Sequence, residues 1–195
     1  MKKTYTRRDC LKLMGSTVVG SQIVGGAQPL GAETDRARVV GPGGMTAAED
    51  MRGTFVILST PYTESGAVHY DDLAFQVEWL DHAGAHGLVW PQNSSDYPRL
   101  TTEEIRRGFE VLTEANRGRS LTLVLGVQQD STPEMVAQAT FAEGLEPDMM
   151  IAMPPKVGDS LEDYREYYSA LAEVTSRPIM IQTSPNRPGL EFKTD

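Results

Sequence analysis

Polar side chains follow an apolar run close to the end of this chain, in a pattern that could bind a small carboxylate. The run Ile179 to Ile181 is followed at once by Gln182 and Thr183. A buried parallel strand delivers polar groups in this way to a site at its carboxyl end. Arg187 lies in the same loop, and its planar guanidinium can bind a carboxylate through two parallel hydrogen bonds. The alternative interpretation of Arg187 is a solvated loop residue.

Four further apolar runs end in comparable polar or proline-rich stretches, which read STPYTESG, WPQNSSDYPRL, GVQQDSTP and AMPPKVGDS. We expect Thr60 either to cap its strand or to line a pocket. Asn93, Ser94 and Ser95 are candidates for ligand contact, although serines are also common in loops without a ligand. Lys156 could act as an amine nucleophile, but a surface lysine is the simpler interpretation.

Two histidines raise the question of a metal site. His82 and His86 have the i,i+4 spacing of metal ligands on one helix. They lie at the end of a predicted helix with no obvious third ligand, and a favourable contact with the helix dipole is the better interpretation. We therefore predict no metal site and no cofactor.

The elements that must position these residues alternate along the chain, with an apolar strand-like run roughly every 30 residues. In the first helical stretch Leu73, Val77 and Leu80 form one apolar stripe, with Phe75 and Trp79 beside it. Met149, Met150 and Met153 are most simply core residues of the fourth run and its end.

Capping residues predict where two of the helices begin and end. Thr101 and Glu104 have the spacing of a capping box, and Gly118 follows the end of that helix. Thr132 before Pro133 predicts an N-cap and a first-turn residue for the next helix.

Strands that are apolar throughout need cover on both faces, which predicts a parallel sheet wrapped by helices. No glycine-rich phosphate turn follows the first strand, so a barrel is favoured over a doubly wound nucleotide-binding sheet. Five strand–helix units do not close an eight-stranded barrel, which usually takes about 250 residues. We predict an α/β fold over residues 53–195, a (β/α)8 TIM barrel truncated after about five strands.

The segment before this domain predicts export. Arg7 and Arg8 precede a weakly apolar, glycine-rich stretch that is too short for a membrane span. Residues 1–32 are interpreted as a twin-arginine export signal and residues 33–52 as a linker. The export machinery would be a partner, and the mature protein would be periplasmic or extracellular. The alternative is a disordered basic N-terminus of a cytosolic protein.

Composition limits the class of protein further. The 195 residues include 39% apolar and 23% charged residues, which is ordinary for one soluble domain. The net charge of -9 argues against nucleic-acid binding, because a protein that binds nucleic acid needs a basic face to neutralise phosphates. Cys10, the single cysteine, lies in the predicted signal, so no disulfide is expected in the mature chain.

From Gly53 to Gly189 the chain resembles the dihydrodipicolinate synthase / N-acetylneuraminate lyase family of (β/α)8 barrels. The stretches that carry the resemblance are STP, SGAVHYDDLAFQVEWLDHAGAHGLV, LTTEE and SPNRPG. The resemblance implies a class I lyase or aldolase that forms a Schiff base between a lysine and a 2-oxo acid. That lysine belongs to the sixth strand and would lie outside this sequence.

Two departures from the family pattern concern the site itself. The family loop Gly-Thr-Thr-Gly-Glu, which holds the carboxylate of the oxo acid, corresponds to residues 92–96, where Ser94 aligns with the second threonine and Asp96 with the glutamate. The family's catalytic tyrosine corresponds to Gln182, whose amide cannot act as acid or base near neutral pH. Arg187 matches a family arginine that pairs with a substrate carboxylate.

Two functions therefore remain open at this point. The first is an exported lyase-family enzyme acting on a 2-oxo acid such as pyruvate. The second is a non-catalytic protein that binds small carboxylates on the same barrel, as the departures at Gln182 and in the 92–96 loop suggest. A homo-oligomeric full-length form is compatible with either.

Overall fold

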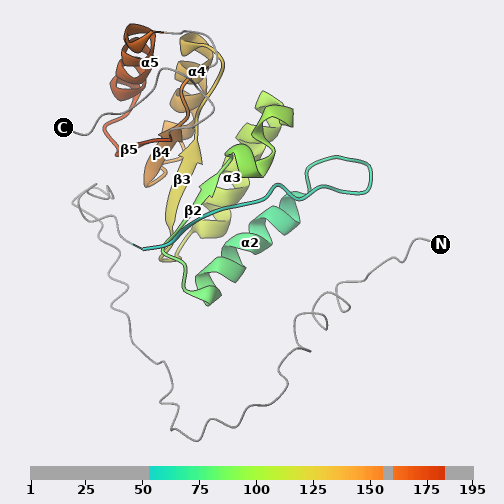
Figure 1. The fold of residues 1–195 in the computed structure, drawn as a ribbon. Coiled ribbons are helices and arrows are strands. Elements are labelled where there is room, and N and C mark those ends of the chain that lie inside the picture. Colours follow the sequence, from blue (N-terminus) through green and yellow to red (C-terminus); the bar gives the residue numbers. More distant parts are fainter. Residues whose placement is uncertain (1–52, 156–159, 183–195) are drawn as a thin grey trace, which may run out of the picture. The chain divides into compact units, whose positions relative to one another are not determined.

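The computed structural model describes residues 53–155 and 160–182 (Figure 1). The predicted signal, the linker, Lys156 and Arg187 lie outside the described residues. The strands are β1 (Phe55–Ile57), β2 (Gly87–Trp90), β3 (Thr122–Gly126), β4 (Met149–Ala152) and β5 (Ile179–Ile181). The helices are α2 (Tyr70–Ala83), α3 (Thr102–Asn116), α4 (Thr132–Glu143) and α5 (Leu161–Val174), with short 3-10 turns η2 (Asn93–Ser95) and η3 (Tyr97–Arg99).

The strands form one five-stranded sheet in the order β1-β2-β3-β4-β5, and every neighbouring pair is parallel. Each strand is followed by a helix and then by the strand that lies next to it in the sheet. Parallel strands linked in this way are joined by right-handed crossovers. Such crossovers place the helices α2 to α5 on one face of the sheet, along which Figure 1 shows them arranged. The predicted alternation and the parallel sheet are confirmed.

The strand residues alternate between two apolar clusters. The larger cluster joins one face of the sheet to the helices and includes Trp90 and Tyr167, both fully buried. The smaller cluster consists of strand residues alone, Val89, Val124, Met149 and Ile151, with Phe55 and Met180 packed against it. Both faces of the sheet are therefore apolar, as the uniformly apolar runs predicted.

Predicted core residues lie largely where expected. Leu73, Val77 and Leu80 of α2 are buried, whereas the flanking Phe75 and Trp79 are 56% and 60% exposed. Met149 and Met150 are buried, and Met153 is partly buried against the larger cluster. The side of α2 that carries Phe75 and Trp79 thus faces solvent in the described part of the chain.

The start of α3 is predicted correctly, and the start of α4 is not. The Glu104 amide donates to Thr101 Oγ1 at 3.2 Å, and the Thr101 amide donates to Glu104 Oε2 at 2.9 Å. In α4, however, Ser131 is the extended N-cap residue and Thr132 is already helical. The prediction was wrong by one residue because Pro133 is also tolerated at the second helical position, where the backbone needs no amide donor.

Within the described residues, no helix is both long enough and apolar enough to cross a membrane.

Candidate active site

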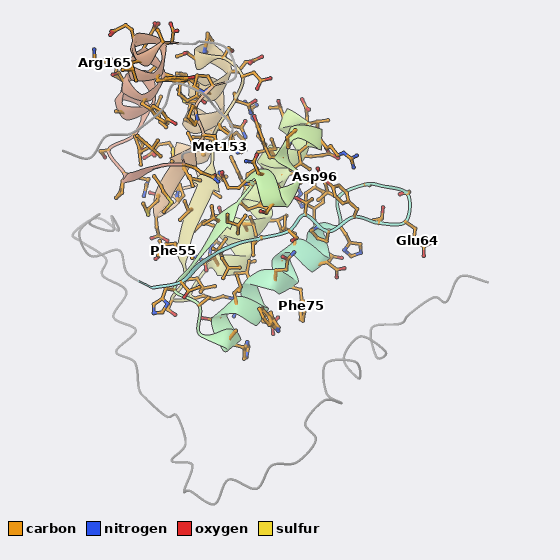
Figure 2. The ribbon with its side chains drawn as sticks, viewed as in Figure 1. Phe55, Glu64, Phe75, Asp96, Met153 and Arg165 are labelled. Atoms are coloured by element: carbon orange, nitrogen blue, oxygen red, sulfur yellow. The ribbon has the colours of Figure 1, made fainter. Side chains whose placement is uncertain are left out.

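The parallel sheet brings the polar segments after each strand to one edge. Figure 2 shows Asp96, after β2, and Met153, after β4, at this edge, and Phe55 towards the opposite end of the sheet. Thr60, Gln92, Ser95 and Gln128 lie at the same edge, because they follow β1, β2, β2 and β3. The carboxyl ends of β1, β2 and β3 therefore carry a shared polar cluster.

Two hydroxyl groups connect the ends of β1 and β2. Trp90 Nε1 donates to Thr60 Oγ1 at 3.0 Å, and the Thr60 hydroxyl donates to the Ser95 carbonyl. The Ser95 hydroxyl accepts from the Gln92 amide at 3.0 Å and donates to the Leu58 carbonyl. Thr60 and Ser95, both buried, thus position the loop after β2, and their hydroxyl protons are used inside the protein.

The other two predicted loop residues lie on the surface. Asn93 and Ser94 belong to η2 and are exposed, whereas the residues on either side of them are buried. Asp96 ends η2 with a left-handed backbone, φ 58°, and its carboxylate lies 3.6 Å from the Arg99 guanidinium. The structure therefore separates the four sequence candidates into a buried pair, Thr60 and Ser95, and an exposed pair.

A chain of amide groups continues from β2 to β3. Gln128 Nε2 donates to the Pro91 carbonyl at 2.8 Å, and Gln92 Nε2 donates to Gln128 Oε1 at 2.9 Å. The Pro91 carbonyl can only accept, so it fixes the orientation of Gln128, and Gln128 in turn fixes that of Gln92. The Ser95 amide, which faces Gln92, donates to the Gln92 backbone carbonyl at 2.9 Å. Gln92 Oε1 is left buried without a hydrogen-bond partner.

A glycine on β3 makes room for this amide chain. A Cβ atom at Gly126 would lie 2.1 Å from the Pro91 carbonyl oxygen and 2.8 Å from Gln92 Nε2. Both distances are shorter than a non-bonded contact allows. Sequence reasoning did not single out Gly126 or Gln128, although the GVQQD stretch after β3 carried both.

The end of β5 is polar but contains no acid or base at its last described residue. The Gln182 amide donates to the Ala152 carbonyl at 3.1 Å, which continues the strand pairing with β4. Its side-chain Oε1 is buried without a hydrogen-bond partner. Tyr168, from α5, donates through its hydroxyl to the same Ala152 carbonyl at 3.2 Å.

A cavity of about 190 Å³ lies beside the cluster, between η3, the start of α3 and the β3–α4 loop. Buried Tyr97 lines it together with Asp130 and Glu134. Burial, and then these two carboxylates, raise the pKa of Tyr97 to about 12. Tyr97 is therefore a neutral phenol throughout the physiological pH range.

The two histidines contact different backbone groups. His82 Nδ1 lies 2.9 Å from the Glu78 carbonyl within α2, and His86 Nδ1 accepts from the Thr54 amide at 3.1 Å. No cluster of three metal-ligating side chains occurs among the residues the structure describes. His82 thus contacts its own helix, whereas His86 lies beyond the end of α2 and contacts the segment before β1, so the two histidines do not share one helix.

The chain is similar to proteins of one family over most of the described region. Residues 50–195 match the dihydrodipicolinate synthetase family. The 4-hydroxy-tetrahydrodipicolinate synthase of Rhizobium meliloti is 27% identical over 145 residues, which cover 74% of this chain and 49% of the relative. The enzyme of the same name from Mesorhizobium japonicum is 31% identical over 140 residues, covering 70% and 47%.

Solved structures agree in fold. The dihydrodipicolinate synthase of Agrobacterium tumefaciens matches with a TM-score of 0.64 and 28% identity, over 69% of this chain and 46% of that one. N-acetylneuraminate lyase from Mycoplasma synoviae matches with a TM-score of 0.63 and 24% identity, over 68% and 46%. The fold is thus an α/β fold of the TIM-barrel type, and the chain spans about half the length of the curated relatives it matches.

Proposed function

The chain belongs to the dihydrodipicolinate synthetase family, and from this premise we propose that the protein is a lyase acting on a 2-oxo acid such as pyruvate through a lysine Schiff base. The observation that carries the proposal is the polar cluster at the carboxyl ends of β1 to β3. In barrels of this type, ligands are bound and reactions take place at that end of the strands. Covalent attachment to a lysine would provide the electron sink for bond cleavage beside the oxo group.

Named residues take the following proposed roles. Arg187 pairs with a carboxylate of the substrate, because its fork can form two parallel hydrogen bonds. Exposed Asn93 and Ser94 supply polar contacts to the oxo acid, and buried Thr60 and Ser95 hold their loop in place. Gln182 orients a water or a substrate hydroxyl by hydrogen bonding, since its amide cannot transfer a proton near neutral pH.

The proposal is tested by trapping the Schiff base. The whole protein encoded by the gene is incubated with pyruvate, reduced with borohydride and measured by mass spectrometry. We expect the mass of one reduced pyruvyl group, located by peptide mapping on a lysine. A matched incubation with acetate, which has no oxo group, should add no mass. Absence of the pyruvate adduct would contradict Schiff-base chemistry.

The second candidate function is a non-catalytic protein that binds a carboxylate on the same barrel. Gln182 favours it, because an amide stands at the family's tyrosine position. A protein with this second function would bind pyruvate, as measured by calorimetry, but would give no adduct trapped by borohydride.

We also propose that residues 1–32 direct export through the twin-arginine pathway, because Arg7 and Arg8 precede a short, weakly apolar stretch. Replacing both arginines by lysine keeps the charge and should abolish export. Fractionation of cells that produce the double variant and the wild type measures this. Undiminished export of the variant would exclude the proposed signal.

A further inference from the structure

Two buried glutamines lie on the face of the sheet away from the helices, at the edge that carries the proposed substrate site. Gln92 is fully buried, and Gln128 is 2% exposed. A Cβ atom at Gly126 would lie 2.8 Å from Gln92 Nε2 and 3.2 Å from Gln128 Nε2, so both amides lie over this glycine. Gly126 follows Val124 by two residues on β3 and shares its face, that of the smaller apolar cluster. The two amides therefore belong to the inner side of the sheet and not to the layer between sheet and helices.

Gln128 belongs to a segment whose backbone is held on both sides. Before it, the Val127 amide donates to the Ile151 carbonyl of β4 at 2.9 Å. After it, the Gln129 amide donates to Tyr167 Oη at 3.1 Å, and the Tyr167 hydroxyl donates to the Gln129 carbonyl at 3.3 Å. Tyr167 is fully buried on α5. The backbone around Gln128 is thus fixed to both β4 and α5.

Gln92 begins the η2 loop, which carries the proposed substrate contacts. It is the extended N-cap residue of η2, and its backbone carbonyl accepts from the Ser95 amide at 2.9 Å and the Tyr97 amide at 3.4 Å. The exposed Asn93 and Ser94 lie between these bonded residues. A shift of Gln92 would therefore move both exposed side chains.

The Gln128 side chain joins these two segments through two hydrogen bonds. Its Nε2 donates to the Pro91 carbonyl at 2.8 Å, and its Oε1 accepts from Gln92 Nε2 at 2.9 Å. We propose that Gln128 is a positioning residue for the 2-oxo acid, which holds the η2 loop in the conformation that receives the substrate. This inference rests on the proposed function, in which Asn93 and Ser94 contact the oxo acid, and it assigns Gln128 no contact with the substrate.

The variant Gln128→Glu tests this link because its protonation state switches the link on and off. A protonated carboxyl keeps both bonds, since its hydroxyl donates to the Pro91 carbonyl and its other oxygen accepts from Gln92. An ionised carboxylate has no donor and places an oxygen against that carbonyl. Burial raises the pKa of such a carboxyl above its ordinary value of about 4.3. The variant should therefore hold the loop at low pH and release it as the pH rises through the raised pKa.

The first measurement, hydrogen exchange, needs no ligand. It is made from about pH 5 to about pH 9, the range in which buried carboxyls titrate, and is expressed as protection relative to free peptide. In Gln128→Glu, protection of the Ser95 and Tyr97 amides should fall roughly tenfold as the pH rises, the equivalent of one hydrogen bond. The Leu123 amide is the internal reference, because it donates to Asp148 at the other end of β3.

The wild type should show no such step in the η2 loop. In Gln128→Met, which can form neither bond, protection of the same two amides should be low at every pH. Protection of the η2 amides that is unchanged in both variants would overturn the proposal. So would protection that falls equally at Leu123 in both variants, since the effect would then not be local to the loop.

The second measurement is pyruvate affinity, determined by calorimetry on the whole protein over the same pH range. In Gln128→Glu the Kd should match the wild type at low pH and rise roughly tenfold as protection of the η2 loop is lost. Gln128→Met should have a raised Kd throughout. Gln138→Glu is the matched control, because Gln138 is a buried glutamine on α4 whose Oε1 accepts from Arg106 at 3.3 Å. Its Kd should follow that of the wild type at every pH.

The outcomes separate this inference from the proposed function. Release of the η2 loop with unchanged pyruvate affinity would overturn Gln128 as a positioning residue for the substrate. An equal rise of Kd with pH in Gln138→Glu would also overturn it, since any buried carboxylate would then have the same effect. If the wild type binds no pyruvate, the proposed function fails together with the role of Gln128 towards the substrate. A pH-dependent step in η2 protection would still support Gln128 as the residue that holds the loop.

Discussion

The polar cluster at the carboxyl ends of the strands differs from the cavity of about 260 Å³ at their amino ends, lined by the end of α3 and the α4–β4 connection, in how the buried hydroxyl groups are bonded. At the carboxyl end, the Thr60 and Ser95 hydroxyls each accept one hydrogen bond and donate another. At the amino end, the Thr113 hydroxyl has no partner, whereas amide oxygens without partners are buried at both ends, Gln92 Oε1 and Gln182 Oε1 at one and Asn116 Oδ1 at the other. Buried polar groups without partners are costly, so a fold usually retains few of them.

The two regions also differ in how tightly they are packed. Gly126 at the carboxyl end has no room for a Cβ atom, whereas a Cβ atom at Gly118 of the cavity lining would meet nothing within 4 Å. Gly144, just after α4, would make only an ordinary contact at 3.4 Å. We infer from this difference that the carboxyl end is closely packed and hydrogen-bonded, so that added side-chain volume there should destabilise the fold. The amino end is held by ion pairs and hydrogen bonds beside a cavity, so that its stability should depend more on the charges of its side chains.

The largest expected effect is at Gly126. Gly126→Ala places a methyl group against the Pro91 carbonyl and the Gln92 amide. The backbone cannot move enough to avoid this clash, so the substitution should lower the free energy of unfolding by about 3 kcal/mol. Gly144→Ala is the matched control and should raise it by about 0.5 kcal/mol, because its backbone is right-handed helical. Urea unfolding of both variants measures this. Equal changes in the free energy of unfolding would contradict the inferred difference in packing between the two ends.

The next effect concerns pH and Tyr97. The folded protein raises its pKa from 10.0 to about 12, so folding holds the phenol proton more tightly than the unfolded chain does. Stability from this group is complete below pH 10 and should fall by about 2–3 kcal/mol as the pH rises from about 10 to about 12. Urea unfolding across this range measures the slope. Tyr97→Phe should lack this part of the slope; the same decline in both proteins would exclude Tyr97 as its source.

A smaller effect is expected at the amino end, where Arg177 joins α4 to the segment before β5. Its Nε donates to the Glu143 carboxylate at 3.1 Å and its Nη1 to the Pro147 carbonyl at 2.6 Å. Arg177→Met keeps most of the apolar stem but removes the donor to the Pro147 carbonyl and leaves the Glu143 carboxylate with the Thr175 hydroxyl alone, and should cost about 2 kcal/mol. Arg165→Met, which breaks an exposed pair with Glu162, should cost less than about 1 kcal/mol. Thermal unfolding compares them, and equal losses would contradict a larger contribution from the partly buried pair.

Much of the fold could be predicted because it depends on local patterns. The apolar runs, the stripe of Leu73, Val77 and Leu80, and the capping box at Thr101 are each visible within a few residues of sequence. The start of α4 was missed because Ser131 and Thr132 are both good caps and only the tertiary structure chooses between them.

The site was harder to predict because its contacts join residues far apart in the chain. The bond between Gln92 and Gln128 spans 36 residues, and that between Ser95 and Leu58 spans 37. The sequence correctly placed Thr60 and Ser95 at strand ends, but it could not tell that their hydroxyls bind backbone rather than open space. Ser94 has the same residue type as Ser95, and only their positions in η2 make Ser94 exposed and Ser95 buried.

The most direct test of the central claim, that a 2-oxo acid binds at the carboxyl end of the strands, is hydrogen exchange with and without pyruvate. Backbone amides of Gln92 to Tyr97 and Val127 to Gln129 should exchange more slowly when pyruvate is bound. Those of Leu145 to Asp148, at the amino end, should exchange at the same rate. Protection confined to the amino-end segment, or none at either end with pyruvate bound, would contradict the account.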